Sequence, residues 1–423
     1  MTPPETPDAP AAAPTSPFAY RDYAVYQASR FCVTLAIQMQ GLAVGYHVYR
    51  LTGRTLDLAL VGLAQFLPAF VLSLVTGHVA DRFDRRHVLA VSGVAQVVVS
   101  ALLALIAWTG AGGTPAIYAV LLLGGTARAF AGPAGSALMP TLVPGPVVPR
   151  AIAWSSTLWQ IATIAGPALG GLVYGVSRVP TWVYTSCLVI ELVSVAGFLA
   201  VRARPAIVRR GAVTLDSLLA GVRYVRSKPV LLGAISLDLF AVLLGGAVAL
   251  LPVFAEDVLR VGVGGLAWMR SMPAIGAACM ALLLSQRPLA RRSGIWMFAA
   301  VAVFGLATIV FGLSESFALS IAALFVIGAS DMVSVYVRQT LIQLRTPDEM
   351  RGRVSAVNMV FVGASNELGE FESGVVATFL GDGPTGAVRA VVVGGIGTLC
   401  VVALWASLFP ALRKVDKLDS EVG

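Results

Sequence analysis

The segment GHVADRFDRRHVL, residues 77–89, places five charges between Asp81 and Arg86 in a chain in which only 12% of the residues are charged. Long apolar segments flank it on both sides. Soluble globular chains usually carry about 25% charged residues. Because this chain is 57% hydrophobic, with a mean hydropathy of +0.83, most of its surface must face lipid. The charged segment is therefore predicted to be a loop between two membrane spans.

Apolar runs long enough to cross a bilayer recur along the whole chain. A hydrocarbon core about 30 Å thick needs roughly 20 residues of helix. The runs are continuously apolar, whereas the strands of a membrane barrel alternate over about ten residues. We therefore expect an all-α membrane protein with twelve transmembrane helices. The runs cover residues 24–49, 56–80, 87–108, 115–138, 151–176, 180–201, 229–254, 264–286, 294–313, 316–340, 354–378 and 387–410.

The basic residues predict the orientation of these spans. One set of loops contains 21 of the 30 Lys and Arg, and the loops on the other side contain 5. Cytoplasmic loops are the ones enriched in Lys and Arg. Both termini are therefore expected in the cytoplasm, and the net charge of +8 needs no nucleic-acid partner to explain it.

The chain divides into two similar halves. We expect a disordered tail over 1–20, six-helix bundles over 21–203 and 228–412, a cytoplasmic linker over 204–227 and a tail over 413–423. The segment LVPGPVVPRAIAWSSTLWQIATIAGPALGG, from Leu142, resembles RTPDEMRGRVSAVNMVFVGASNELGEFESG, from Arg345. Such duplication is the usual construction of secondary transporters. At an offset of 203 residues the matching pairs include Pro144 and Pro347, Arg150 and Arg353, Gly166 and Gly369, and Gly171 and Gly374.

The residue types that metal sites and enzymes need are scarce. The four cysteines are far apart, and the three histidines do not pair at ligand spacing, so neither a metal site nor a disulfide framework is indicated. No cofactor is expected. The phosphate-binding loop G-x-x-x-x-G-K-[ST] is missing, which argues against an ATP-driven pump. No Ser/His/Asp constellation supports an enzyme.

Three motifs resemble those of the major facilitator superfamily. The loop Gly77-x-x-x-Asp81-Arg82-x-x-Arg85-Arg86 resembles the signature loop between the second and third helices. Arg128-x-x-x-Gly132 is similar to the fourth-helix arginine motif, and GPALGG, residues 166–171, resembles the fifth-helix motif of antiporters. Asp84 stands where the family loop usually has Gly; Asp also tolerates turns, so the turn is expected to be kept.

Further segments resemble one bacterial group within the superfamily, the enterobactin-exporter-like (transmembrane secretion effector) group. These segments are VADRFDRRHVL, LLPVFAEDVL at 250–259 and TPDEMRGRVSAVN at 346–358. The resemblance implies a monomeric inner-membrane protein built of two pseudo-symmetric six-helix bundles. It also implies transport of a small-molecule substrate by alternating access, with protons as the coupling partner.

The resemblance further implies that the signature loop contacts the other half when the cytoplasmic side closes. A charge pair that exists in only one conformation biases the equilibrium between the two. The alternative is that Asp81 pairs only within its own loop. The expected gate residues are Gly77, Asp81, Arg82, Arg85 and Arg86 in the loop, with Arg351 and Arg353 at the start of the eleventh span.

Ionisable residues inside the spans are costly and therefore point to function. Glu367 and Glu370 share one face of a helix because they are three residues apart. The proton-coupling candidates are Asp238, Glu367, Glu370 and Arg128. The alternative for the carboxylates is a structural ion pair, for instance with Arg270 or Arg338. Glu191 is expected to neutralise an arginine, for which Arg128 is the candidate.

The small residues of the fifth span, Gly166, Pro167, Gly170 and Gly171, are expected to allow close helix packing and a bend at the proline. Polar and aromatic residues are candidates for lining a central cavity, although aromatic residues in spans more often face lipid or pack. The candidate substrate-binding residues are Gln38, Gln40, Tyr46, Trp154, Trp159 and Asn358.

These observations together predict a secondary transporter rather than an enzyme. The expected activity is proton-coupled export of a hydrophobic or amphipathic small molecule, such as a drug or a siderophore. A proton-linked importer would share the fold, and a transport-inactive membrane scaffold or sensor is the alternative from another functional class.

Overall fold

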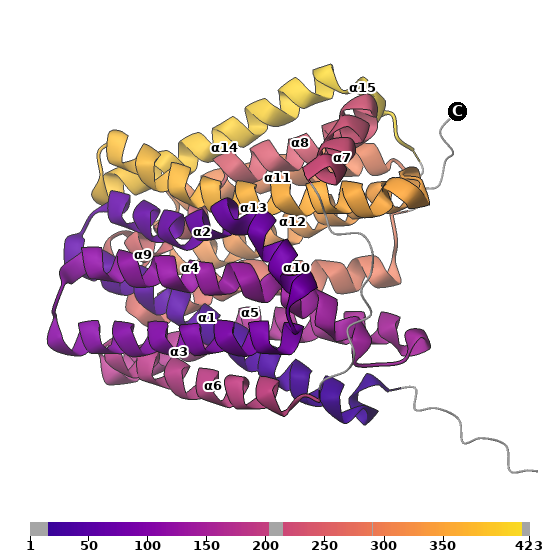
Figure 1. The fold of residues 1–423 in the computed structure, drawn as a ribbon. Coiled ribbons are helices and arrows are strands. Elements are labelled where there is room, and N and C mark those ends of the chain that lie inside the picture. The colour runs from indigo at the N-terminus through magenta and orange to yellow at the C-terminus, as the bar shows by residue number, and fades with distance from the viewer. Residues whose placement is uncertain (1–15, 203–214, 290, 417–423) are drawn as a thin grey trace, which may run out of the picture.

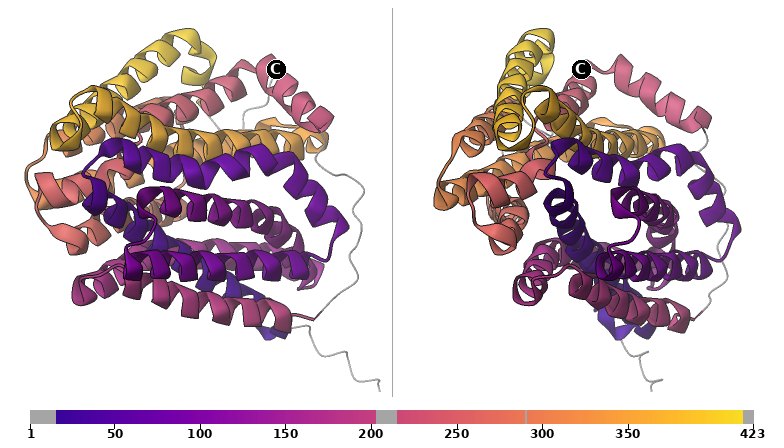
Figure 2. Two further views of the ribbon diagram at one scale, coloured as in Figure 1. Left: turned by 60° about the vertical axis from the view of Figure 1, so that its left-hand side comes forward. Right: turned by 90° about the vertical axis from the view of Figure 1, so that its left-hand side faces the viewer.

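The computed structural model describes residues 16–202, 215–289 and 291–416. Within these ranges the chain is helical and contains no β-strand. Two groups of helices lie one above the other in Figure 1, the N-terminal group below and the C-terminal group above. Both views of Figure 2 keep the same separation. The predicted all-α fold with two six-helix bundles is confirmed.

Six long helices form the N-terminal bundle. They are α1 (Arg21–Thr52), α2 (Thr55–Arg82), α3 (Arg85–Thr109), α4 (Gly113–Leu138), α5 (Val148–Ser177) and α6 (Thr181–Ala200). Short 3₁₀ turns precede α1 (η1, Pro17–Ala19) and follow α4 (η2, Met139–Thr141; η3, Gly145–Val147).

The C-terminal bundle repeats this plan with one broken helix. Its seventh span begins as α8 (Pro229–Leu244) and continues through η4 (Ala247–Leu250), α9 (Leu251–Val253) and the π-helix η5 (Phe254–Val258). The break lies at Gly245 and Gly246, because glycine disfavours a continuous helix. The remaining helices are α10 (Gly262–Gln286), α11 (Ser293–Leu313), α12 (Phe317–Arg345), α13 (Asp348–Phe379), α14 (Gly383–Leu408) and the short α15 (Pro410–Arg413).

Ten segments of the described chain are long and apolar enough to cross a membrane, counting the broken seventh span as one. The other two of the twelve predicted spans, α5 and α13, also form long helices of 30 and 32 residues. Polar residues, Gly and Pro lower the hydropathy of α5, and acidic residues lower that of α13. The two least apolar spans are therefore the duplicated pair.

Helix ends follow the local sequence. Gly53 closes α1 and Gly110 closes α3, each in the left-handed conformation (φ 65° and 69°) that glycine adopts readily. Asp84 caps α3, since its side chain accepts a hydrogen bond from the Arg86 amide at 2.9 Å. The residue that departs from the family loop thus keeps the turn by capping the following helix.

The duplicated glycines occupy equivalent places in the two halves. Gly166 of α5 packs against Leu35 and Gln38 of α1, and its counterpart Gly369 of α13 packs against Val242 and Leu243 of α8. A Cβ atom on Gly166 would lie 2.4 Å from the Gln38 Cβ. Each bundle therefore brings its fifth helix against its first at a matching glycine.

The second duplicated pair joins the two bundles. A Cβ on Gly171 would lie 2.4 Å from the Ala267 Cβ of α10, and one on Gly374 would lie 2.6 Å from the Ala59 Cβ of α2. Figures 1 and 2 show α2 alongside α13. The interface between the halves thus includes two related contacts, α5 with α10 and α13 with α2.

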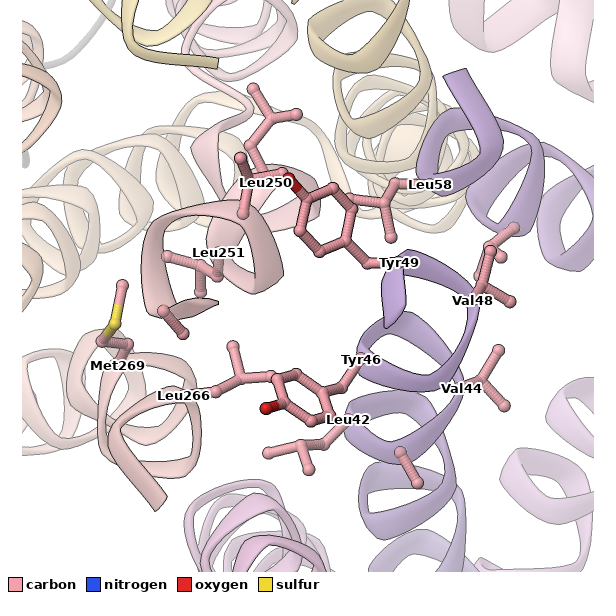
Figure 3. Packing of buried hydrophobic residues seen from close by; sticks show 14 of the residues in the cluster. Leu42, Val44, Tyr46, Val48, Tyr49, Leu58, Leu250, Leu251, Leu266 and Met269 are labelled. Atoms are coloured by element: carbon pink, nitrogen blue, oxygen red, sulfur yellow. The ribbon is translucent and has the colours of Figure 1, made fainter. Parts of the chain in front are cut away.

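A hydrophobic core crosses this interface near one end of the molecule. Figure 3 shows Tyr46 and Tyr49 of α1 facing Leu250 and Leu251 of the broken span. This end, on the left in Figure 1, contains the loops predicted to be extracellular, and the start of α1 and α15 lie at the opposite end.

Part of the predicted linker is structured. Residues 215–227 form helix α7 (Leu215–Ser227). The Tyr224 hydroxyl donates a hydrogen bond to the Arg345 carbonyl at 3.5 Å, and Gly221 packs against the backbone of Arg353. Helix α7 therefore belongs with the C-terminal bundle, at the start of α13.

Candidate transport site and gates

Charged side chains from both bundles meet at the interface between them. Arg128 of α4 donates a hydrogen bond to the Gln65 side chain of α2 at 3.0 Å. It also interacts electrostatically with Glu367 of α13. Arg270 of α10 interacts with Glu367 and Glu370 and donates to the Gly41 carbonyl of α1 at 3.3 Å. Three of the four predicted coupling residues, Arg128, Glu367 and Glu370, are thus brought together.

The two glutamates of this cluster are not held in ion pairs. Among the residues that the structure describes, neither Glu367 nor Glu370 forms a salt bridge. Glu370 lies opposite Gly62 of α2, where an added Cβ would be 3.7 Å from the Glu370 Cβ. Both carboxylates therefore lie at the interface between the halves, close to cations but without an ion-pair partner among the described residues.

Asp238, the fourth predicted coupling residue, lies inside the C-terminal bundle. It is buried on α8, pairs with Arg338 of α12, and accepts a hydrogen bond from the Ser334 hydroxyl at 3.1 Å. This arrangement favours the structural ion pair that was the alternative for this carboxylate. A protein with such a buried pair is strongly destabilised when one partner is removed and the other charge is left without a counter-ion.

The end of the molecule with the predicted extracellular loops is closed by polar contacts between the bundles. The Tyr46 hydroxyl donates to Glu256 Oε2 at 2.5 Å, and Arg50 Nη1 donates to Glu256 Oε1 at 2.5 Å. The Tyr49 hydroxyl donates to Asp257. Tyr46, predicted to bind substrate, belongs to this group of contacts. From the predicted orientation we call the group the extracellular latch; it comprises Tyr46, Tyr49 and Arg50 with Glu256 and Asp257.

A second polar contact joins the bundles at this end. Asp382 Oδ1 accepts hydrogen bonds from the Thr55 hydroxyl at 2.5 Å and the Thr55 amide at 3.0 Å. Partial burial by itself would raise the pKa of Asp382, but these hydrogen bonds and one from the Gly383 amide hold it below the ordinary carboxyl value of 3.8. Asp382 is therefore ionised at neutral pH.

Four arginines of the predicted cytoplasmic gate form hydrogen bonds or ion pairs within their own halves. Arg85 donates to the Ala137 carbonyl at 3.1 Å, and Arg86 to the Val201 carbonyl at 3.2 Å. Arg351 pairs with Asp348 at 2.6 Å on its own helix. Similarly, Arg353 donates to the Met350 sulfur at 3.4 Å, and Arg82 is exposed. The side chains of Gly77 and Asp81 lie outside the described residues.

The remaining substrate-binding candidates are not gathered at one place. Gln38 lies at the α1–α5 contact. The Gln40 amide donates to the Ser100 hydroxyl at 3.0 Å inside the N-terminal bundle. Asn358 is buried, and both tryptophans are exposed, with Trp154 stacked edge-on against Phe18.

Glu191 does not meet Arg128, the partner suggested for it. It is fully buried on α6 next to Ser100, whereas Arg128 bonds to Gln65 and faces Glu367. The fifth-span residues Gly166, Gly170 and Gly171 all lie at close helix contacts.

Residues 24–370 match the model of the Major Facilitator Superfamily. The chain belongs to this superfamily. It is similar to the enterobactin exporter EntS of Shigella boydii serotype 4 (strain Sb227), with 26% identity over 341 residues that cover 78% of this chain and 79% of the relative. The same values apply to EntS of Escherichia coli O1:K1 / APEC. This major facilitator protein is therefore a multi-pass membrane transporter with a small-molecule substrate.

Solved major facilitator structures have the same fold. A mutant of the nucleoside transporter NupG aligns with a TM-score of 0.75 and 12% identity, covering 92% of this chain and 100% of that one. A bacterial homologue of the human lysosomal transporter Spinster, in an inward-facing and unoccupied conformation, aligns with a TM-score of 0.69 and 14% identity, covering 95% and 97%.

Proposed function

We propose that this transporter is a proton-coupled exporter of hydrophobic or amphipathic small molecules in the bacterial inner membrane, with both termini in the cytoplasm. The observation that carries the proposal is the position of Glu367 and Glu370, unpaired at the bundle interface and near Arg128 and Arg270. The exporter names of the relatives support the direction of transport.

The distribution of contacts supports alternating access. The extracellular latch and the Thr55–Asp382 contact join the halves at one end. At the other end, Arg351 and Arg353 bond within their own helix. We assign this arrangement to the inward-facing state. In the outward-facing state the latch breaks, and the signature loop meets the start of α13.

Coupling follows from charges that lie on different halves. Arg128 belongs to the N-terminal bundle, and Glu367 belongs to the C-terminal bundle. When the halves rotate, the distance between them changes, and with it the free energy of leaving Glu367 ionised in a medium of low dielectric constant. A proton taken up from outside is then released to the cytoplasm as Arg128 approaches, which drives substrate outward.

Proton release from inside-out vesicles tests the proposal. Vesicles with an acidic interior and a pH-sensitive dye are given pools of siderophores, lipophilic cations or macrolides. A pool that contains a substrate should release protons. Glu370→Gln and Glu367→Gln should each reduce this release at least about tenfold, since a neutral amide cannot take up the proton.

Glu349→Gln is the matched control, because Glu349 is exposed at the cytoplasmic start of the same helix. It should transport like the unmodified protein. Unchanged proton release in both interface variants would contradict coupling through this cluster. Uptake of substrate into right-side-out vesicles, driven by external acid, would contradict export.

A further inference from the structure

Three polar side chains form a line along one face of α12. Asp331, Ser334 and Arg338 are spaced i, i+3 and i+7, and this spacing places them above one another on a helix. Asp238 of α8 faces this line, pairing with Arg338 and accepting a hydrogen bond from Ser334. Asp331 extends the line by one turn beyond Ser334.

A small cavity connects the two aspartates. It is lined by Asp238, Asp331, Ser330 and Ser334, together with apolar residues that include Val301 and Phe304 of α11. Its volume of about 10 Å³ is close to the least space in which one water molecule fits. A water in it would have carboxylate and hydroxyl partners on two sides.

The charges around this cavity do not balance if both aspartates are ionised. Arg338 compensates one carboxylate, and α11 lines the cavity with apolar residues. The charged groups near the interface on the other helices packed against α12 are Arg270 of α10 and Glu367 and Glu370 of α13, which interact with one another. Two carboxylates that share one site in a protein interior do not both ionise readily.

We propose that Asp238, Asp331 and Arg338 form a second proton-binding site, inside the C-terminal bundle, in which the two carboxylates and one water share a single proton. The site is neutral when it holds one proton, since the guanidinium balances the one remaining carboxylate. That this site takes part in the transport cycle rests on the proposed function. That it binds a proton does not.

This arrangement makes the two aspartates interchangeable partners of Arg338. If Asp238 is neutralised, Asp331 loses its proton and becomes the counter-ion on the same helix face. If Asp331 is neutralised, the Asp238–Arg338 pair is left intact. Neutralising both leaves a buried guanidinium without any counter-ion, which is far more costly than either single change.

Infrared spectroscopy of the purified transporter at pH 7 tests for the proton. Difference spectra in the carboxylic-acid carbonyl region compare the unmodified protein with each variant. Asp331→Asn and Asp238→Asn should each lose the signal of one protonated acid. Glu349→Gln, the exposed control, should lose only ionised carboxylate signal. The acid signal that these two variants lose should persist in Glu367→Gln/Glu370→Gln. The second proton-binding site would therefore be supported even if the proposal of proton-coupled export were refuted.

The yield of folded protein gives a second, independent test. Each single Asn variant should fold, whereas Asp238→Asn/Asp331→Asn should reduce the yield at least about tenfold below either single variant. Replacing Arg338 as well, by Met, should restore it. The proposal is overturned if Asp331→Asn leaves the acid signal unchanged, if Asp238→Asn retains it, or if the double variant folds as well as Asp238→Asn alone.

Discussion

Asp382 joins the two halves of the transporter through a single carboxylate oxygen. That oxygen accepts from the amide and the hydroxyl of Thr55 and also from the Gly383 amide at 2.9 Å. The residue lies at φ 50° and ψ 175°, a conformation that residues other than glycine rarely adopt. One side chain therefore joins the two halves and caps α14.

The low pKa of Asp382 sets the sign of its pH dependence. Because the pKa is held below 3.8, its contribution to closure is complete above that value and is lost only as the pH falls through the lower folded-state pKa. Spin labels at Ala111 and Glu315, in a variant lacking the four native cysteines, should give the same distance from pH 5 to 8. Asp382→Ala should increase the open population about tenfold. Two results together would contradict this assignment: the distance in the unmodified protein changes between pH 5 and 8, and this change disappears in Asp382→Ala.

The sequence predicts some site residues better than others. Glu367, Glu370 and Arg128 could be predicted because charge inside an apolar run is costly and therefore conspicuous. Glu256, Asp257 and Asp382 were missed, since acidic residues at span ends are usually solvated. The FAED segment, residues 254–257, and the tyrosines at 46 and 49, three residues apart, were the available signal for this contact. Whether the two segments touch depends on how two distant helices pack.

At the scale of helices, α5 packs on α10 and α13 packs on α2 across the interface between the halves. In each pair a glycine lets the helices approach. The duplication at an offset of 203 residues predicted that Gly171 and Gly374 are equivalent. It could not predict their partners, because the rotation of each helix about its axis is not encoded in the periodicity of continuously apolar runs.

Adding a methyl group at either glycine should open the extracellular end. Gly171→Ala would place its Cβ 2.4 Å from that of Ala267, and overpacking of this kind costs about 1–3 kcal/mol. The label pair at Ala111 and Glu315 should therefore report a larger open population. Gly363→Ala, which meets nothing within 4 Å, is the control.

A size exchange makes this test sharper. Adding Ala267→Gly to Gly171→Ala restores the space and should return the closed population. If the double variant stays as open as Gly171→Ala alone, the contact does not set the equilibrium.

The seventh span shows that an apolar run does not predict whether a helix is continuous. Residues 229–254 were predicted as one uninterrupted helix, and the structure breaks it after Leu244. Apolar composition reports burial, whereas Gly245, Gly246 and Pro252 decide continuity. Similarly, α7 arises within a segment predicted only as a linker, because its apolar face is short and packs on α13.

For the whole molecule, the contacts describe one of two states. The halves meet at the end predicted to be extracellular, while Arg351 and Arg353 bond within α13. The two-bundle plan could be predicted from the duplication and the signature loop. Which end is closed could not, because both states are built from the same helices and differ by a rotation of one bundle against the other.

Removing a contact of the opposite state should favour the state described here. Asp81→Asn and Arg353→Gln should each increase the inward-facing population, because the proposed cytoplasmic gate forms only when that side closes. Labels at Ser136 and Ser285, both exposed, would measure it. Arg413→Gln, at an exposed residue of α15 that is not part of the gate, should leave the distance unchanged. An unchanged distribution in Asp81→Asn would remove that residue from the gate.

The Asp238–Arg338 pair has a consequence for biosynthesis. Its partners are separated by 100 residues, so α8 leaves the ribosome well before α12. At about 5–20 residues per second, Asp238 waits roughly 5–20 s for its counter-ion. During that interval the aspartate must enter the membrane uncharged or stay beside the insertion machinery. The C-terminal bundle therefore matures only when its fourth helix arrives, and a chain truncated before α12 should be recognised by the quality-control proteases of the cell.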